Sequence, residues 1–167
     1  LGYEIIHNGD DADLIVINTC HIREKAVEKT YSELGRYRDQ AKLRKEQTGK
    51  KTIIAVAGCV AQAEGEAIMK RSPWVDIVVG PQSYQSLPDL ISKVDPVEKN
   101  KLIKIDFPIV PKFDELKSKI SQRGPSAFLT IQEGCDKFCS FCVVPYTRGS
   151  EYSRSIDSII QEAKSLI

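Results

Sequence analysis

The sequence of 167 residues has no long hydrophobic run and no excess of charge of one sign. No stretch approaches the ~18 consecutive apolar residues of a membrane-spanning helix, so we expect no membrane partner. The start lacks a signal-peptide pattern, and no internal repeat or low-complexity tract is visible. The net charge of +1 carries no global signal for nucleic acid. An apolar content of 41% and a charged content of 28% are typical of a globular protein with ample material for a core.

Both ends of the sequence look like cuts. It begins at Leu1 rather than at Met, and it ends inside an apolar helical pattern. We therefore expect a chain truncated at both ends, holding one domain and part of another.

The first ~95 residues alternate strand and helix patterns. Apolar runs of strand length lie at 13–18, 52–57 and 75–79, and helical spacing covers 22–46, 61–70 and 84–93. Strands that are apolar throughout and separated by helices form parallel sheets with both faces covered. We predict an α/β domain over residues 1–95, an N-terminal open parallel sheet flanked by helices.

Residues 96–125 are charged, rich in proline, and predicted to be a linker with one strand candidate at 102–107. A strand at 127–131 is then expected to lead into a loop with three cysteines. A helix follows from Ser155, a plausible N-cap, with apolar residues at helical spacing. This order predicts that 126–167 begin a partial TIM-type barrel with its first βα unit, and barrel active sites lie on the loops after the strands.

Three of the five cysteines, Cys135, Cys139 and Cys142, form a C-x3-C-x2-C triplet in that loop. Structural zinc sites normally want four protein ligands, whereas a 4Fe–4S cluster can use three thiolates and keep one iron open. S-adenosylmethionine could bind at such an iron and be split. The alternatives are unrelated buried cysteines or half a zinc site. An odd cysteine number also fits a reducing cytosol better than a disulfide scaffold, so we expect a cytoplasmic protein.

Cys20 and Cys59 occupy equivalent places, each after a predicted buried strand and before a helix. Ligands of open parallel sheets bind beyond the carboxyl ends of the strands. As metal ligands, the two would need neighbouring strands ~4.8 Å apart, with both thiols at one edge, in a cavity facing the Cys135 loop. From spacing alone, two small buried hydrophobic residues are an equally good interpretation.

Three segments carry a resemblance to a known family: 18–26 (NTCHIREKA), 57–62 (AGCVAQ) and 134–149 (GCDKFCSFCVVPYTRG). The triplet is similar to the radical-SAM signature. Together the segments resemble the methylthiotransferase family of radical-SAM enzymes. The stretches IREKA and VVPYTRG resemble its tRNA-modifying branch rather than its ribosomal-protein branch.

The resemblance implies two 4Fe–4S clusters and S-adenosylmethionine. Cys135, Cys139 and Cys142 match the ligands of the cluster that splits S-adenosylmethionine, and Cys20 and Cys59 match two of three auxiliary-cluster ligands. The implied reaction adds a methylthio group to C2 of N6-isopentenyladenosine beside the tRNA anticodon. The resemblance also implies a third ligand of the auxiliary cluster before Leu1 and further barrel strands after Ile167. It implies an electron donor such as flavodoxin or ferredoxin as well. We expect a monomer, and we expect the 167 residues alone to be inactive.

Side chains around the cysteines have less specific patterns. Phe138 and Phe141 could exclude water from a cluster or could pack the loop onto the barrel. Arg148 and Arg154 could reach a phosphate or the carboxylate of S-adenosylmethionine, with a structural role equally plausible. His21 follows Cys20 and could be a donor beside a ligand or a surface residue.

Other functional classes leave distinct signatures. The ribosomal-protein methylthiotransferases share the chemistry but not the motif wording. A non-catalytic iron–sulfur carrier predicts a fourth cysteine near proline, which the sequence lacks, and a zinc-structural nucleic-acid module predicts zinc without sulfide. The basic segment 36–45, with Lys50 and Lys51, could contact RNA phosphates or form a solvated helix face.

Overall fold

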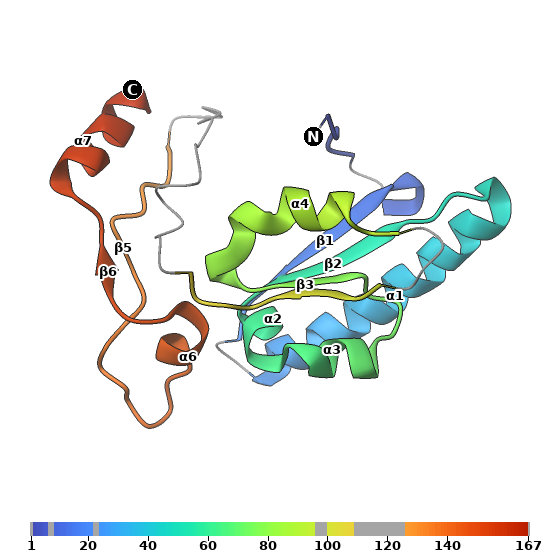
Figure 1. Ribbon diagram of the computed structural model, residues 1–167, viewed down its shortest axis with the longest axis horizontal. Coiled ribbons are helices and arrows are strands. Elements are labelled where there is room, and N and C mark those ends of the chain that lie inside the picture. The colour runs from blue at the N-terminus through green and yellow to red at the C-terminus, as the bar shows by residue number, and fades with distance from the viewer. Residues whose placement is uncertain (1, 7–8, 22–23, 96–99, 109–125, 167) are drawn as a thin grey trace.

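The computed structural model describes residues 2–6, 9–21, 24–95, 100–108 and 126–166 (Figure 1). A four-stranded parallel sheet with the order β1-β2-β3-β4 lies at its centre. The strands are β1 (Leu14–Thr19), β2 (Ile53–Gly58), β3 (Ile77–Val79) and β4 (Leu102–Lys104). The prediction of an α/β fold with an open parallel sheet flanked by helices is confirmed.

Helices cover both faces of this sheet. A 3-10 turn, η1 (Gly9–Asp11), precedes β1, and α1 (Glu24–Thr48) connects β1 to β2. The short helices α2 (Cys59–Glu64) and α3 (Glu66–Arg71) follow β2 and lie with α1 on one face. The 3-10 segment η2 (Pro81–Ser86) and α4 (Leu87–Ser92) follow β3 and cover the other face (Figure 1).

The two faces bury separate hydrophobic cores because successive side chains of a strand point to opposite sides. Val56 of β2 and Val78 of β3 pack against Leu34 of α1 on the first face. Ala57 and Val79, one residue further along each strand, pack with the α4 side chains on the second. Burial on both faces explains the continuous apolar runs from which these strands were predicted.

Two predicted helices are each divided in the structure. The helix predicted over 61–70 begins earlier, at Cys59, and is interrupted at Gly65, whose φ of 48° is left-handed. The helix predicted over 84–93 is a 3-10 segment followed by α4, with proline near the start of each. Proline has no N–H for a helical hydrogen bond and is tolerated only in the first turn, so it marks where each segment begins.

Residues 102–104, which the sequence analysis placed inside a linker, form β4 and pair with β3. The sheet therefore extends into the segment assigned to the linker.

The strand predicted at 127–131 is not formed, so that part of the predicted barrel unit is wrong. The strand β5 is shifted to Gln132–Glu133 and pairs antiparallel with β6 (Tyr152–Ser153). A strand needs a hydrogen-bonded neighbour and a face to bury, and Phe128 and Ile131 are exposed. The loop and the helix of the predicted order are present.

Two helices complete the C-terminal region. The unpredicted α6 (Val144–Arg148) follows the third cysteine of the triplet. The last helix, α7 (Ile156–Ser165), begins as expected at Ser155, whose side chain accepts a hydrogen bond from the N–H of Ser158. No helix among the described residues combines the length and the hydropathy needed to cross a bilayer.

Candidate functional site

Cys20 and Cys59 follow neighbouring strands at the same edge of the sheet. The last registered pair of β1 and β2 is Thr19 with Gly58, and one cysteine comes directly after each. Paired strands lie ~4.8 Å apart, so the two cysteine backbones are close neighbours. The Cys59 side chain is buried and Cys20 is exposed. The predicted strand arrangement is present.

Gly58 and Thr19 fix the backbone around Cys59. Gly58 has a left-handed φ of 97°, and a Cβ there would lie 2.3 Å from the Thr19 carbonyl oxygen. The Thr19 hydroxyl donates to the Ala57 carbonyl at 2.6 Å and accepts from the Val60 N–H at 3.1 Å. This hydroxyl therefore joins the end of β1 to the first turn of α2, where Cys59 stands.

The cysteine loop (residues 134–143) is closed by backbone contacts. The Cys135 N–H donates to the Gly149 carbonyl at 3.2 Å, and the Cys142 N–H donates to the Cys139 carbonyl at 2.9 Å. Gly134 has a φ of 76°, and a Cβ there would lie 2.0 Å from the Ser150 carbonyl oxygen. The triplet thus sits on a tight loop whose entry requires glycine.

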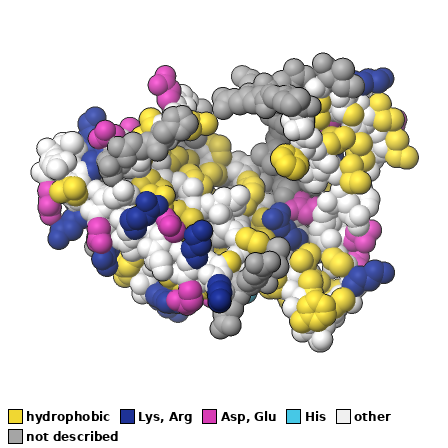
Figure 2. Space-filling model, turned by 180° about the vertical axis from the view of Figure 1, so that it is seen from behind, with side chains coloured by type: hydrophobic (Ala, Val, Ile, Leu, Met, Phe, Trp, Pro, Cys, Tyr) yellow, Lys and Arg dark blue, Asp and Glu magenta, His cyan; other side chains and the backbone are white. Residues whose placement is uncertain are grey.

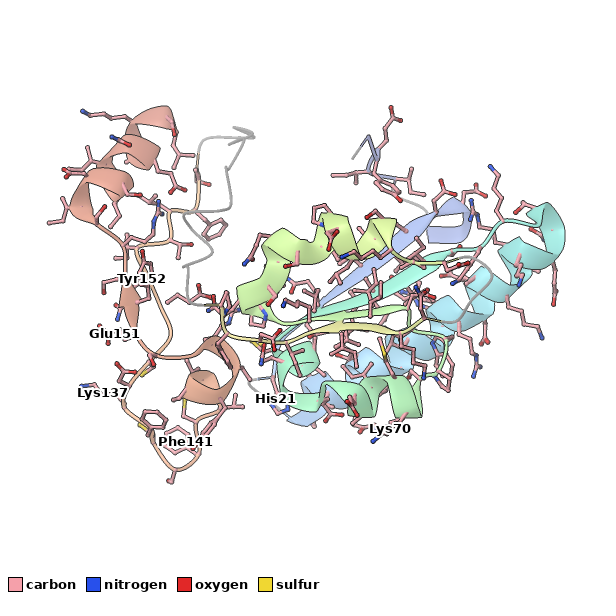
Figure 3. All side chains as sticks on the ribbon, viewed as in Figure 1. His21, Lys70, Lys137, Phe141, Glu151 and Tyr152 are labelled. Atoms are coloured by element: carbon pink, nitrogen blue, oxygen red, sulfur yellow. The ribbon has the colours of Figure 1, made fainter. Side chains whose placement is uncertain are left out.

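The aromatic residues between the cysteines do not pack the loop onto a core. Phe138 has a left-handed φ of 47° and meets Tyr146 edge to face, with ring centroids 6.1 Å apart. Phe141 is 91% exposed at the tip of the loop (Figure 3). The packing role considered for Phe141 is therefore absent from this structure.

The cysteine loop and the cysteine edge of the sheet come together through α6. This helix packs against α2 and η2, and the Gln82 side-chain amide donates to the Arg148 carbonyl at 2.7 Å. The Arg148 guanidinium pairs with Glu133 at 2.8 Å. Burial opposes its positive charge, but hydrogen bonds and charge interactions with Glu133 and Cys59 outweigh it and raise the pKa of Arg148. Arg148 therefore connects the start of the cysteine loop to the Cys59 neighbourhood.

A cavity of about 580 Å³ lies between the sheet region and the cysteine loop. His21, next to Cys20, and Cys142 both line it. Figure 3 shows His21 on the sheet region and Lys137 and Phe141 on the loop. Of the five cysteines, Cys142 is the one among the described lining residues, so the common cavity predicted for the Cys20 and Cys59 thiols stays a prediction.

Charged side chains of three helices form another wall of this cavity. Arg71 pairs with Glu28 at 3.3 Å and lies 3.7 Å from the centre of the Tyr31 ring. The Tyr31 hydroxyl donates to Glu64 at 2.6 Å. Burial, and then the Glu64 carboxylate, raise the pKa of Tyr31 to about 12. Tyr31 is therefore a neutral anchor that joins α1 to α2.

The candidate metal ligands of this chain are all cysteines. No three Cys, His, Asp or Glu side chains in the described part of the chain converge as ligands of one metal ion. All five cysteines are free thiols, the donor type that iron–sulfur clusters use. Three thiols in one loop and two at one sheet edge are the donor set that the implied clusters would use.

Arg154 and the basic segment have structural partners. Arg154 pairs with Glu162 and donates to the Thr130 carbonyl, which ties α7 to the residues before β5. On α1, Arg36 pairs with Glu33, and Arg38 pairs with Asp39. These contacts favour the structural interpretation of Arg154 and dilute the charge of α1.

Sequence reasoning missed several residues that shape the site. Thr19, Gln82, Tyr84 and Glu133 hold the cysteine edge and the loop together, and the Tyr84 hydroxyl donates to the Asn18 side chain at 2.9 Å. Thr19 gave no usable local signal, because its hydroxyl contacts residues 38 and 41 positions away rather than the helix that follows it. The others make contacts over 15 or more positions, for which the local sequence holds no pattern.

Comparisons with known proteins agree with this architecture. Residues 1–80 match the model of the family described as "Uncharacterized protein family UPF0004". The tRNA-2-methylthio-N(6)-dimethylallyladenosine synthases of Rickettsia bellii and Rickettsia rickettsii are each 58% identical over 166 residues, and that of Rickettsia akari is 57% identical. Each alignment covers 99% of this chain and 37% of the relative. The resemblance drawn from the sequence is thereby confirmed: residues 1–80 match the UPF0004 family model, and the chain is similar across 99% of its length to these synthases, of which it spans 37%.

Proposed function

We propose that the chain is part of a radical-SAM methylthiotransferase that modifies an adenosine of tRNA. The observation that carries the proposal is the placement of two cysteines at one sheet edge, with a cysteine triplet packed against that edge through α6. The names of the relatives, which specify a tRNA nucleoside, support tRNA over a ribosomal protein as the substrate.

Cys135, Cys139 and Cys142 would hold one 4Fe–4S cluster, and Cys20 and Cys59 would supply two ligands of a second. Such clusters, when bound, supply one-electron reduction of S-adenosylmethionine and a site for the transferred sulfur. The protein would hold the ligand cysteines in position. Gly134 and the Cys135–Gly149 hydrogen bond hold the triplet loop in shape.

The residues that line the cavity would hold the substrate beside the cysteine triplet. The cavity of about 580 Å³ has Cys142 on one wall and Glu28, Glu64 and Arg71 on another. A volume of this size is typical of pockets for small molecules or a single nucleoside. The Arg71 guanidinium, which is partly exposed and contacts Glu28 and the Tyr31 ring, could orient a phosphate or a carboxylate. A tRNA substrate and a reduced set of thiols also agree with a cytoplasmic location.

A chimeric enzyme tests this function. Residues 1–166 would replace the matching segment of the Rickettsia bellii synthase, in a host without its own enzyme, and tRNA nucleosides would be analysed by mass spectrometry. We expect methylthiolated adenosine from the chimera and none after Cys139→Ala or Cys59→Ala. Ser140→Ala, in the same loop, is the matched control and should retain the product.

The metal content of the chain provides an independent measurement. After anaerobic reconstitution we expect iron and acid-labile sulfide in a ratio near one, with both reduced by Cys139→Ala. Unchanged iron and sulfide in this variant would contradict the assignment of the triplet. Zinc without sulfide would support the structural-module alternative.

A further inference from the structure

A second pocket, of about 550 Å³, lies at the opposite end of the sheet from the cysteines. It is formed by the second half of α1 and by the residues that precede β2, β3 and β4. The strands run from this pocket to the cysteine edge, and six residues of β2 correspond to ~20 Å. Five of its lining side chains are basic: Arg38, Lys42, Lys45, Lys51 and Lys101.

Among the described lining residues the one carboxylate, Asp76, is already neutralised. Asp76 accepts from Lys51 at 2.7 Å with one oxygen and from the Ile54 N–H at 3.0 Å with the other. Four basic side chains then remain without compensation from the pocket itself. The fold therefore brings together positive charges from α1 and from the residues before β2 and β4, which are far apart in the sequence.

Two of these four cations, Lys45 and Lys101, are free to meet an external anion. Among the described residues, no carboxylate lies within ion-pair distance of Lys45 or Lys101. Lys101 donates to the Met69 carbonyl, a neutral group. Arg38 and Lys42 each pair with an exposed carboxylate of α1, Asp39 and Glu46, so their charges are partly compensated. Figure 2 shows Lys and Arg side chains spread over the sheet region with some Asp and Glu among them.

An aromatic side chain forms part of the wall. Trp74 is the only tryptophan of the sequence, and it is partly buried. Its indole N–H donates to the Leu34 carbonyl at 3.0 Å, and the Arg38 guanidinium lies 5.0 Å from its ring centre. Guanidinium and ammonium groups bind the phosphates of a nucleic acid. An aromatic wall in the same groove can stack on a base.

We propose that this basic pocket binds phosphates of tRNA at a distance from the modified nucleoside. The inference rests on the proposed tRNA substrate and adds a second contact surface to it. A folded RNA is long enough to reach both ends of the sheet at once. RNA is favoured over an acidic protein segment because the relatives are named for a tRNA nucleoside.

Trp74 gives a direct readout of the pocket. We would titrate the full 167-residue chain with tRNA, follow tryptophan fluorescence, and repeat the titration at several salt concentrations. Fluorescence should change on binding, and affinity should fall as salt rises. For Lys45→Gln combined with Lys101→Gln we expect about tenfold weaker binding and a log–log salt slope smaller by about 1.5, since each phosphate contact contributes ~0.7–0.9.

Lys70→Gln on α3 is the matched control, because Lys70 is also exposed but lies outside the pocket (Figure 3). It should bind like the unsubstituted chain. The single variant Lys45→Gln guards against a folding defect, since the Lys45 side chain is exposed and its loss removes no core contact.

Equal affinity of all variants for tRNA, or no binding by the unsubstituted chain at low salt, would overturn the proposal. Polyglutamate binding as tightly as tRNA would overturn the choice of RNA. The proposed function is tested separately, because Cys139→Ala should abolish methylthiolation in the chimera and leave this titration unchanged.

Discussion

The sheet region and the C-terminal region of this chain are built differently. In the sheet region, residues of β2 and β3 are buried on both faces, and Leu34, Ile77 and Val78 are fully inaccessible. In residues 126–166 only Pro145 and Thr147 are buried. Large hydrophobic side chains are exposed there instead, and Figure 2 shows them over that region at the lower right.

This contrast separates a self-sufficient scaffold from a segment held by a few specific contacts. Burial of apolar surface is the main stabilising contribution in the sheet region, at ~25 cal/mol per Å². The cysteine loop relies on backbone hydrogen bonds, on the Arg148–Glu133 pair and on the packing of α6. Regions with few buried apolar contacts open at lower free energy than cores do. We therefore expect the triplet to be more mobile than Cys59.

The largest expected effect is a core truncation in the sheet region. Leu34→Ala removes a fully buried side chain between α1 and the sheet, and should lower the free energy of unfolding by about 2–5 kcal/mol. Ile160→Ala in α7, where Ile160 is 45% exposed, should cost less than ~1 kcal/mol. Urea denaturation followed by circular dichroism measures both, and equal costs would erase the contrast.

The second prediction concerns the turn before Cys59. Gly58→Ala should destabilise the sheet by about 2 kcal/mol, because the new methyl group meets the Thr19 carbonyl in a left-handed backbone conformation. Gly35→Ala is the matched control. Gly35 lies in α1 with open space around it, so alanine should stabilise that helix by about 0.5–1 kcal/mol. If Gly58→Ala leaves the free energy of unfolding unchanged, this edge of the sheet is not rigid.

The sheet region was largely predictable from sequence because each strand is a continuous apolar run. The runs at 13–18 and 52–57 differ from β1 and β2 by only one residue at each end. The placement of Cys20 and Cys59 at one edge followed from the rule that parallel strands share their carboxyl ends. The break at Gly65 was not predicted, because an isolated glycine inside a helical pattern can be tolerated.

The C-terminal region was less predictable because its elements depend on distant partners. The run at 127–131 has strand composition, but among the described residues it pairs with no strand, and the two-residue strand β5 formed beside it instead. The contact of Gln82 with Arg148 joins positions 66 residues apart, and local patterns carry no such information. The helix α7 was predicted well because its cap and its apolar spacing are local.

A third prediction tests the link between the two regions. Arg148→Met should remove the ion pair of Arg148 with Glu133, which is 10% exposed, and should loosen the cysteine loop by about 1–2 kcal/mol. Hydrogen exchange at the Cys135 and Gly149 amides should become faster, while amides of β2 keep their protection. Arg148→Lys should cause a smaller increase in exchange, because lysine keeps the positive charge beside Glu133. Unchanged hydrogen exchange in Arg148→Met would mean that backbone contacts alone hold the cysteine loop in place.

A fourth prediction is pH-dependent and belongs to the sheet region. Tyr31 has its pKa raised from 10.0 to about 12, chiefly by burial and then by the hydrogen bond to Glu64. The folded state keeps the phenol proton that the unfolded state loses, so this stability is complete below pH 10 and is lost as pH rises towards 12. Tyr31→Phe should cost about 1 kcal/mol at neutral pH and flatten the alkaline loss. An unchanged alkaline profile would contradict the burial of this hydroxyl.

The smallest expected effect lies at the end of the C-terminal region. Ser155→Ala removes the cap that accepts the Ser158 N–H, and should weaken α7 by about 0.5–1 kcal/mol. Because α7 contains no buried residue, this loss should appear as faster hydrogen exchange in 156–160 and leave the urea transition of the sheet unchanged. Ser165→Ala, which removes only the hydrogen bond to the Glu162 carbonyl at the other end of α7, is the matched control and should change neither measurement. If Ser155→Ala shifts the global transition, α7 and the sheet unfold as one unit, and the cysteine loop between them then shares the stability of the scaffold.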